Sequence, residues 1–165
     1  MPDGTLVSCS QDKTIKYWDI TNGSCIRTLH GHSDEVLCLL HLKNGDLASG
    51  SADKTINIWK KDSGECIRTL EGHTDSIWGL EFTENHDLIS CSNDKSIKIW
   101  SLISGQCIKS LLGHKSGVYT IKALSSDVLY SASTSDTIKV WDLNSGLCIH
   151  TLSGHQGFVT SLNFI

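Results

Sequence analysis

The sequence repeats a set of histidine, serine, aspartate and tryptophan residues, of which the first three types could build a hydrolytic triad. Each full set starts with a histidine, continues through two serines and ends with a tryptophan. The full sets are His32, Ser49, Ser51, Asp53 and Trp59; His73, Ser90, Ser92, Asp94 and Trp100; and His114, Ser131, Ser133 and Trp141. A partial set is split along the chain: Ser8, Ser10, Asp12 and Trp18, then His155. Because a catalytic nucleophile occurs once, and no Gly-x-Ser-x-Gly motif is present, this recurrence predicts a structural role.

The cysteines are the other reactive residues, and their spacing argues against metal chemistry. Zinc sites need clustered ligands, whereas no Cys-x-x-Cys pair occurs and only His32 of His30-Gly31-His32 belongs to the repeated set. We therefore expect no metal and no cofactor. The seven cysteines are predicted to be small buried hydrophobic residues in a reducing compartment, the cytoplasm or the nucleus: Cys9, Cys25, Cys38, Cys66, Cys91, Cys107 and Cys148.

A period of 41 residues positions all of these side chains. It separates Trp18, Trp59, Trp100 and Trp141, and it also separates four Gly-His pairs and four Cys-Ile pairs. A period of about 20–50 residues indicates an architecture of stacked repeat units. Within one unit, apolar or β-branched runs at 35–42, 46–52, 55–60 and 66–70 alternate with turn-forming clusters at hairpin spacing. Four short strands per unit, and an all-β fold, are predicted.

Residues 47–60, Leu-Ala-Ser-Gly-Ser-Ala-Asp-Lys-Thr-Ile-Asn-Ile-Trp-Lys, with Gly72-His73 downstream, resemble a WD-repeat of a β-propeller. The resemblance covers essentially the whole chain and implies four-stranded antiparallel blades. It also implies that histidine, serine, tryptophan and turn aspartate form one hydrogen-bonded chain in each blade. Lys60 and Ser101 depart from the Asp that often follows the family's tryptophan. Ser135 stands six residues before Trp141, where the other sets have Asp, so a weaker network is predicted there.

The repeat phase predicts a single domain, 1–165, with its units at 1–34, 35–75, 76–116 and 117–157. The first unit holds three strands, and a further strand is expected at 158–165, which would complete the first blade in the same chain or in another. Three closures stay open: a four-bladed monomeric ring, an eight-bladed ring of two chains, and a fragment of a longer propeller. Equal units without insertions favour the wider ring, hence a homodimer.

One position of the innermost strand is the predicted partner contact. In the resembled family this position commonly faces a ligand at the mouth of the propeller, and here it reads Leu37, Trp78, Tyr119 and Thr160. The predicted polar rim comprises Asp34, Glu35, Asp75, Lys115 and Gln156. Packing within the inner ring is the alternative role. A basic column on the outermost strand, Arg27, Arg68, Lys109 and His150, is expected to protect a sheet edge rather than to bind phosphate.

Composition excludes several partner classes. The net charge is -4 and only two arginines occur, so a basic footprint for nucleic acid is missing. No apolar run approaches the roughly 20 residues of a membrane span. We expect a non-catalytic scaffold that binds a protein or peptide. The alternatives are a designed or excised repeat array without a partner and, less favoured, an enzyme with a site in the channel.

Overall fold

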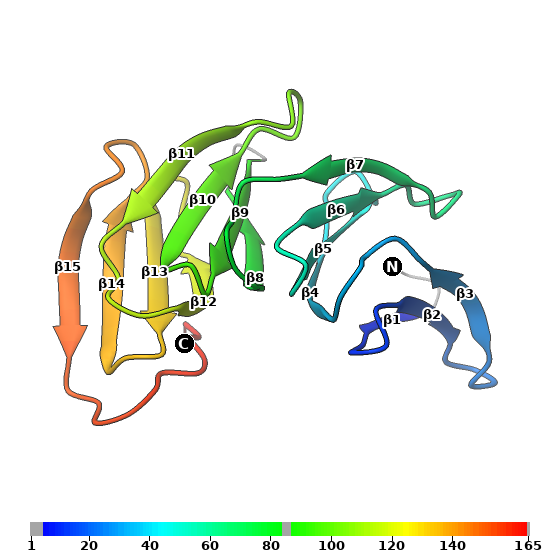
Figure 1. Cartoon of the computed structure of the whole chain (residues 1–165), viewed down its shortest axis with the longest axis horizontal. Helices are drawn as coiled ribbons and strands as arrows, with labels where there is room; N and C mark the ends of the chain where they lie inside the picture. The colour runs from blue at the N-terminus through cyan, green and yellow to red at the C-terminus, as the bar shows by residue number, and fades with distance from the viewer. Residues whose placement is uncertain (1–4, 84–86, 165) are drawn as a thin grey trace.

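The structure is a computed structural model that describes residues 5–83 and 87–164 (Figure 1). The described residues form strands and no helix. The strands make four antiparallel sheets, here called blades one to four, in each of which consecutive strands are neighbours. Residues 1–4 and 165, parts of the predicted first unit and last strand, lie outside the described residues. The all-β prediction is confirmed.

Blade one has three strands and each of the other blades has four. Blade one comprises β1 (Thr5–Cys9), β2 (Ile15–Asp19) and β3 (Cys25–Leu29). Blade two comprises β4 (Val36–His41), β5 (Leu47–Ser51), β6 (Ile56–Trp59) and β7 (Cys66–Leu70). Blade three comprises β8 (Ile77–Phe82), β9 (Leu88–Ser92), β10 (Ser96–Trp100) and β11 (Cys107–Leu112). Blade four comprises β12 (Val118–Ala123), β13 (Val128–Ser133), β14 (Thr137–Asp142) and β15 (Cys148–Ser153).

The turn between the two central strands of a blade has a left-handed residue in three of the four blades. Among the described residues, the non-glycine residues with positive φ are Lys13, Lys54 and Lys95, at 70°, 72° and 72°. A preceding aspartate stabilises each turn, as where Asp53 Oδ1 accepts hydrogen bonds from Thr55 N and Oγ1. Blade four has Ser135-Asp136 in place of this Asp-Lys pair.

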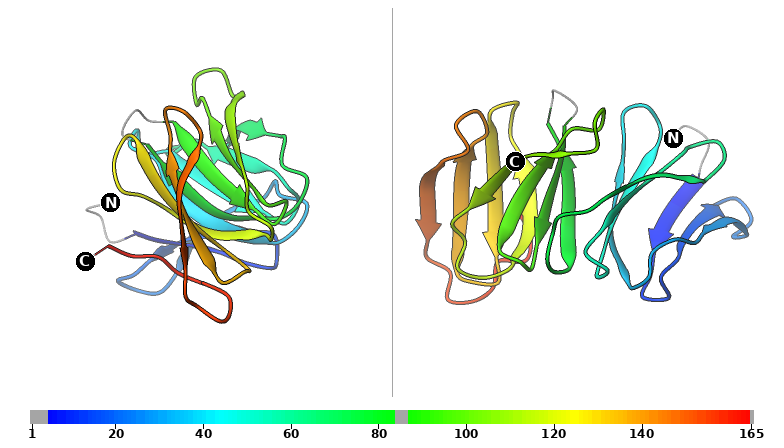
Figure 2. Two further views of the ribbon diagram at one scale, coloured as in Figure 1. Left: turned by 90° about the vertical axis from the view of Figure 1, so that its left-hand side faces the viewer. Right: turned by 45° about the horizontal axis from the view of Figure 1, so that its top comes forward.

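The hydrophobic core lies between neighbouring blades rather than inside one sheet. Ile56 and Ile58 of blade two pack in one cluster with Ile77, Leu88 and Trp100 of blade three. The blades follow one another in an arc, so each blade contacts the blade beside it in the sequence (Figures 1 and 2). The inner strands β4, β8 and β12 lie next to one another along this arc. Each inner strand begins with a buried residue and is otherwise mostly half-buried.

In the single chain, residues 154–164 do not form the additional strand that the repeat phase predicts. Residues 158–164 are irregular, and Phe164 packs edge-on against Tyr130 of β13 with ring centroids 5.3 Å apart. Blade one therefore keeps three strands among the described residues, and a ring closed within one chain is not formed. Closure by a second chain stays a prediction.

Candidate functional site

A buried hydrogen-bonded histidine lies at one end of blade three. This residue is His73. Its Nε2 lies 2.7 Å from Ser90 Oγ, and its Nδ1 lies 2.7 Å from Asp94 Oδ2. Trp100 Nε1 donates to the same Ser90 Oγ at 2.8 Å. We call these contacts the histidine network. Blade two has the same network, with distances of 2.7–2.8 Å, among His32, Ser49, Asp53 and Trp59.

The order Asp94, His73, Ser90 is that of a catalytic triad, but the serine is placed to support the fold. Ser90 is fully buried in the middle of β9, where substrate has no access to it. Its hydroxyl oxygen is also occupied by the indole N–H of Trp100. A catalytic serine needs an exposed hydroxyl. The network instead satisfies buried polar groups that would each cost about 1–3 kcal/mol unpaired.

The aspartate fixes the loop that precedes the inner strand. Asp94 Oδ2 accepts a hydrogen bond from Thr74 N at 3.0 Å, and its Oδ1 accepts one from Ser96 Oγ at 2.6 Å. Burial alone raises the pKa of Asp94, but the hydrogen bonds from His73, Ser96 and Thr74 outweigh it and hold the pKa well below its usual range. In the same way Ser92 Oγ donates to Asp75 O at 2.9 Å. The loop and the central turn are thus held together.

Blade four lacks one contact of the histidine network, as the sequence predicts. His114 Nε2 lies 2.6 Å from Ser131 Oγ, and Trp141 Nε1 donates to that oxygen at 2.7 Å. His114 Nδ1 is buried and has no hydrogen-bond partner within the described residues. Burial and, as the smaller cause, the charge of Lys139 lower the pKa of His114 to about 4. The hydrogen-bond deficit is confirmed, whereas a weaker blade stays a prediction.

Blade one holds only the serine, aspartate and tryptophan of its set. Trp18 Nε1 donates to Ser8 Oγ at 2.8 Å, and Asp12 N donates to Ser10 Oγ at 3.1 Å. His155, which was expected to complete this set, follows β15 and is exposed. In the single chain it makes no hydrogen bond with these residues within the described segments.

The predicted partner residues occupy β-bulges at the start of the inner strands. The pairing of β4 with β5 skips Leu37, that of β8 with β9 skips Trp78, and that of β12 with β13 skips Tyr119. A bulge leaves its extra residue unpaired and re-aims the side chain. The three bulges lie at the end of the blades that carries the histidine network, because each histidine lies in the loop that leads into the inner strand.

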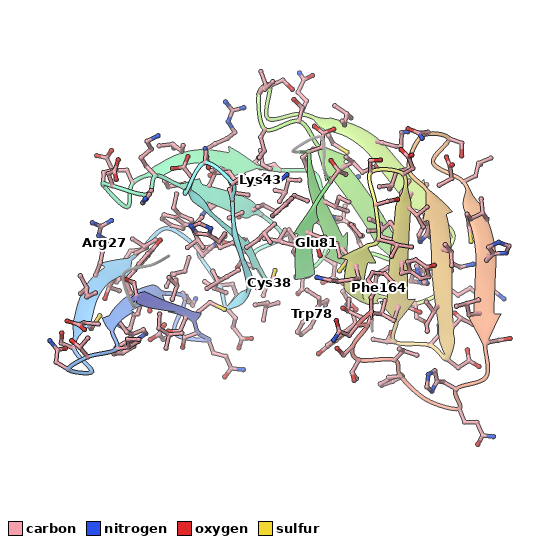
Figure 3. All side chains as sticks on the ribbon, turned by 180° about the vertical axis from the view of Figure 1, so that it is seen from behind. Arg27, Cys38, Lys43, Trp78, Glu81 and Phe164 are labelled. Carbon is pink, nitrogen blue, oxygen red and sulfur yellow. The ribbon has the colours of Figure 1, made fainter. Side chains whose placement is uncertain are left out.

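Two of the bulged side chains are in direct contact. The rings of Trp78 and Tyr119 stack with centroids 4.5 Å apart and planes 20° from parallel. Tyr119 is 36% exposed, and Trp78 and Leu37 are half-buried. In Figure 3, Trp78 lies toward one end of the inner strands and Lys43 toward the other. We call Leu37, Trp78 and Tyr119 the mouth residues. Thr160 is exposed and lies outside any strand, so it does not join them.

The WD domain, G-beta repeat family, WD40, matches the chain at five segments: residues 1–19, 23–60, 64–101, 105–142 and 146–165. The chain belongs to the WD40 family. The predicted resemblance is thereby confirmed, and the histidine network is found in two of the full WD40 blades and partly in the third. The match begins again at the same point of each 41-residue unit, in agreement with the sequence period.

Curated WD40 relatives match one repeat of the chain each. F-box/WD repeat-containing protein 10 of Mus musculus is 43% identical over 42 residues, which cover 26% of this chain and 4% of that protein. F-box/WD repeat-containing protein A of Dictyostelium discoideum is 53% identical over 36 residues, 22% of this chain and 3% of that protein. Nuclear distribution protein PAC1 of Coccidioides posadasii is 50% identical over 36 residues, 22% of this chain and 8% of that protein.

A solved WD40 structure matches nearly the whole chain. The structure of U3-55K superposes with a TM-score of 0.87 and 31% sequence identity, covering 96% of this chain and 51% of that one. The present chain therefore spans about half the length of this structure and less than a tenth of the curated relatives above.

The polar rim around the mouth residues is ordered on one side. Asp75 Oδ1 accepts a hydrogen bond from Ser76 N and its Oδ2 accepts one from Asn93 Nδ2, both at 2.8 Å. These two bonds hold the pKa of Asp75 below its usual value. The other predicted rim residues carry exposed or half-buried side chains: Asp34, Glu35, Lys115 and Gln156. The rim is acidic before β4 and β8 and basic at Lys115, before β12.

The basic column on the outer strands joins neighbouring WD40 blades. Lys109 Nζ of blade three donates to Leu143 O and Asn144 O of blade four at 2.6 and 2.7 Å. Arg27 of blade one likewise donates to Lys61 O and Asp62 O of blade two. Each basic side chain therefore satisfies carbonyls in the turn of the next blade. Interblade bonding, which the sequence did not predict, is the role that the structure gives to these two residues.

The prediction that the repeated cysteines are buried is wrong. The thiols at the start of the four outermost strands are exposed: Cys25, Cys66, Cys107 and Cys148. An outermost strand has a neighbour on one edge only, so a side chain at its start is not covered by the next blade. Cys91 is buried and Cys38 half-buried, and burial raises the pKa of the Cys38 thiol to about 12. No group of three or more His, Cys, Asp or Glu side chains in residues 5–83 and 87–164 is placed to hold a metal.

A small pocket at the opposite end of the blades was missed by the sequence reasoning. It has a volume of about 190 Å³, and its lining includes Leu42, Lys43, Phe82, Leu102 and Ile103. Lys43 Nζ lies 5.4 Å from the centre of the Phe82 ring. Ile103 is 94% exposed in a turn. An isoleucine at a turn position that is otherwise Thr, Asp or Asn in the repeats was the available signal.

In the described part of the chain no helix is long and apolar enough to cross a membrane.

Proposed function

We propose that the chain is a non-catalytic WD40 scaffold that binds a protein or peptide segment at the mouth residues Leu37, Trp78 and Tyr119. The stacked pair of Trp78 and Tyr119 carries the proposal, because two aromatic rings from different blades meet there and keep exposed surface. Trp and Tyr are the residue types most enriched in binding hot spots.

Rigid support beneath the mouth favours this role. The histidine networks of blades two and three lie at the same end as the bulges, and each ties the loop before the inner strand to the central turn of its blade. A surface that is already ordered loses less conformational entropy when it binds a partner. The predicted occupant presents an apolar side chain to the rings, with polar groups that reach Asp75 on one side and Lys115 on the other.

The non-catalytic part of the proposal is supported by the burial of the repeated serines. Ser49, Ser90 and Ser131 are all 0% exposed, and each accepts an indole hydrogen bond. We also propose the cytoplasm or the nucleus as the site of action, because exposed thiols such as Cys25 and Cys66 suit a reducing compartment. The partner-free array is an outcome of the test below.

A displayed library of random peptides, selected on the intact chain, tests the proposal. Selected peptides should bind Trp78→Ala and Tyr119→Ala chains at least about tenfold more weakly, the loss that truncating a hot-spot residue causes. Ile103→Ala at the opposite end is the matched control and should retain binding, since its side chain is 94% exposed and far from the mouth. Unchanged binding by both mouth variants, or no selected peptide at all, would overturn the proposed function.

A further inference from the structure

The incomplete histidine network of blade four points to an anion that is supplied by a modification. Ser135 occupies the place of Asp94 in the central turn and makes two of its contacts. Asp94 N donates to Ser92 Oγ at 3.0 Å, and Ser135 N donates to Ser133 Oγ at 3.4 Å. Each side chain also contacts the hydroxyl of the residue two positions later. For Asp94 this is Ser96 Oγ at 2.6 Å, and for Ser135 it is Thr137 Oγ1 at 3.1 Å. Within the described residues, Ser135 has no counterpart to the bonds that Asp94 accepts from His73 Nδ1, Thr74 N and Ser96 N.

That missing acceptor leaves a buried nitrogen without a partner. His114 is 8% exposed, and its Nδ1 forms no hydrogen bond within the described residues. Such unsatisfied buried groups are rare and destabilising, and native structures normally pair them. In blades two and three a carboxylate oxygen meets this nitrogen at 2.8 and 2.7 Å. The serine hydroxyl of Ser135 instead bonds sideways to Ser133 Oγ at 2.6 Å.

We propose that Ser135 is a phosphorylation site and that its phosphate pairs with His114 to complete the histidine network of blade four. A phosphate carries terminal oxygens that are strong acceptors and about two negative charges at neutral pH. It would thus supply what Asp53 and Asp94 supply in the other blades. This inference does not depend on the proposed binding function.

The surroundings of Ser135 suit the product and leave room for it. Asp136 and Lys139 are the charged residues nearest to Ser135 in the sequence, and Lys115 directly follows His114. Ser135 is half-buried and Asp136 exposed, which lets the bulk of a phosphate lie toward solvent while one oxygen faces His114.

The transfer balances with a nucleoside triphosphate as phosphoryl donor and a protein kinase as catalyst. A bond forms between Ser135 Oγ and the γ-phosphorus, and the bond from that phosphorus to the nucleoside diphosphate breaks. The hydroxyl proton passes to the base of the kinase, and nothing is oxidised or reduced.

Phosphoserine encoded genetically at position 135 of the full chain tests the pairing. The pKa of His114, followed by nitrogen NMR of the ring, should rise from about 4 to above the ordinary value of 6.5, and the melting temperature should rise. Ser135→Asp should move both in the same direction. Phosphoserine at Ser104, an exposed turn residue at the opposite end, is the control and should move neither. An unchanged His114 titration, or a melting temperature below that of Ser135→Ala, would overturn the pairing.

A panel of serine/threonine kinases with magnesium and ATP tests the modification itself. Mass spectrometry should find phosphate at Ser135 in the folded chain and not in Ser135→Ala. A peptide of residues 128–142 serves as the unfolded comparison. Phosphate on the peptide alone, or on neither substrate, would mean that the folded protein is not modified at this site and that the inference is wrong.

Discussion

His73 Nδ1 lies 2.7 Å from Asp94 Oδ2, and the equivalent nitrogen of His114 has no such partner among the described residues. Two blades with the same strands and the same period therefore differ by one side chain in their buried hydrogen bonds. The contribution of the aspartate to the free energy of unfolding can therefore be measured within one chain.

Removal of that aspartate should weaken the fold. Asp94→Ala leaves His73 Nδ1 and Thr74 N without their acceptor, so we expect the free energy of unfolding to fall by about 1–3 kcal/mol. Urea unfolding followed by tryptophan fluorescence measures the loss. The matched variant Ser135→Ala removes no contact to a histidine and should cost clearly less. Equal losses in the two variants would contradict a stabilising role of the aspartate.

His114 should make the fold sensitive to mild acid. Its folded pKa of about 4 lies below the ordinary value of 6.5, so the unfolded chain binds this proton first. The stabilising effect of the neutral ring is complete above pH 6.5 and is lost as the pH falls toward 4. Unfolding curves between pH 7.5 and 4 should show a smaller loss for His114→Gln than for the unchanged chain. Parallel curves would show that His114 does not titrate in this way.

The central turn of blade four should open more readily than the others. Residues 134–142 lack the bond from an aspartate to the histidine, whereas 52–60 and 93–101 have it. Amide hydrogen exchange, read by mass spectrometry or NMR, should therefore be faster in 134–142. Equal protection of the three segments would contradict the predicted weakness.

The basic side chains of the outermost strands should stabilise the fold only where a following blade supplies carbonyls that accept their hydrogen bonds. Lys109→Met removes two bonds to carbonyls of blade four, and we expect a loss of about 1–2 kcal/mol. His150 stands at the same repeat position of blade four, is exposed, and has no following blade to bond among the described residues. His150→Gln is therefore the control and should leave the urea midpoint unchanged. A similar effect of both variants would assign the loss to the outer strand itself.

Two chains are predicted to form one ring. In a second copy, residues 158–164 would lie beside β1 and bring His155 to Ser8. Light scattering after size exclusion should then give a mass near twice 18.1 kDa. A mass near 18.1 kDa would rule out the eight-bladed ring. If residues 158–164 make the contact between the two chains, the Phe158→Asp chain should be a monomer.

The sequence predicted the features that the period repeats. Strand positions followed from the period, and the resemblance to the WD-repeat family implied the bonds of His32 and His73. The bulges at Trp78 and Tyr119 were not predictable, because a bulged strand has the same continuous apolar pattern as a regular one. The exposure of Cys25 was missed because cysteine is usually buried, and the preference of a residue type does not report which strand is outermost.

The exposed thiols give the chain a set of evenly distributed attachment points. The outermost strands carry one each, at Cys25, Cys66, Cys107 and Cys148, while the thiols of Cys38 and Cys91 are shielded and have raised pKa values. Thiolate-directed labels should therefore react at the four outer positions first. Spin or fluorescent labels placed there, one pair at a time, would report the spacing of the blades in solution, and would show whether the arc keeps the same curvature when a partner is bound.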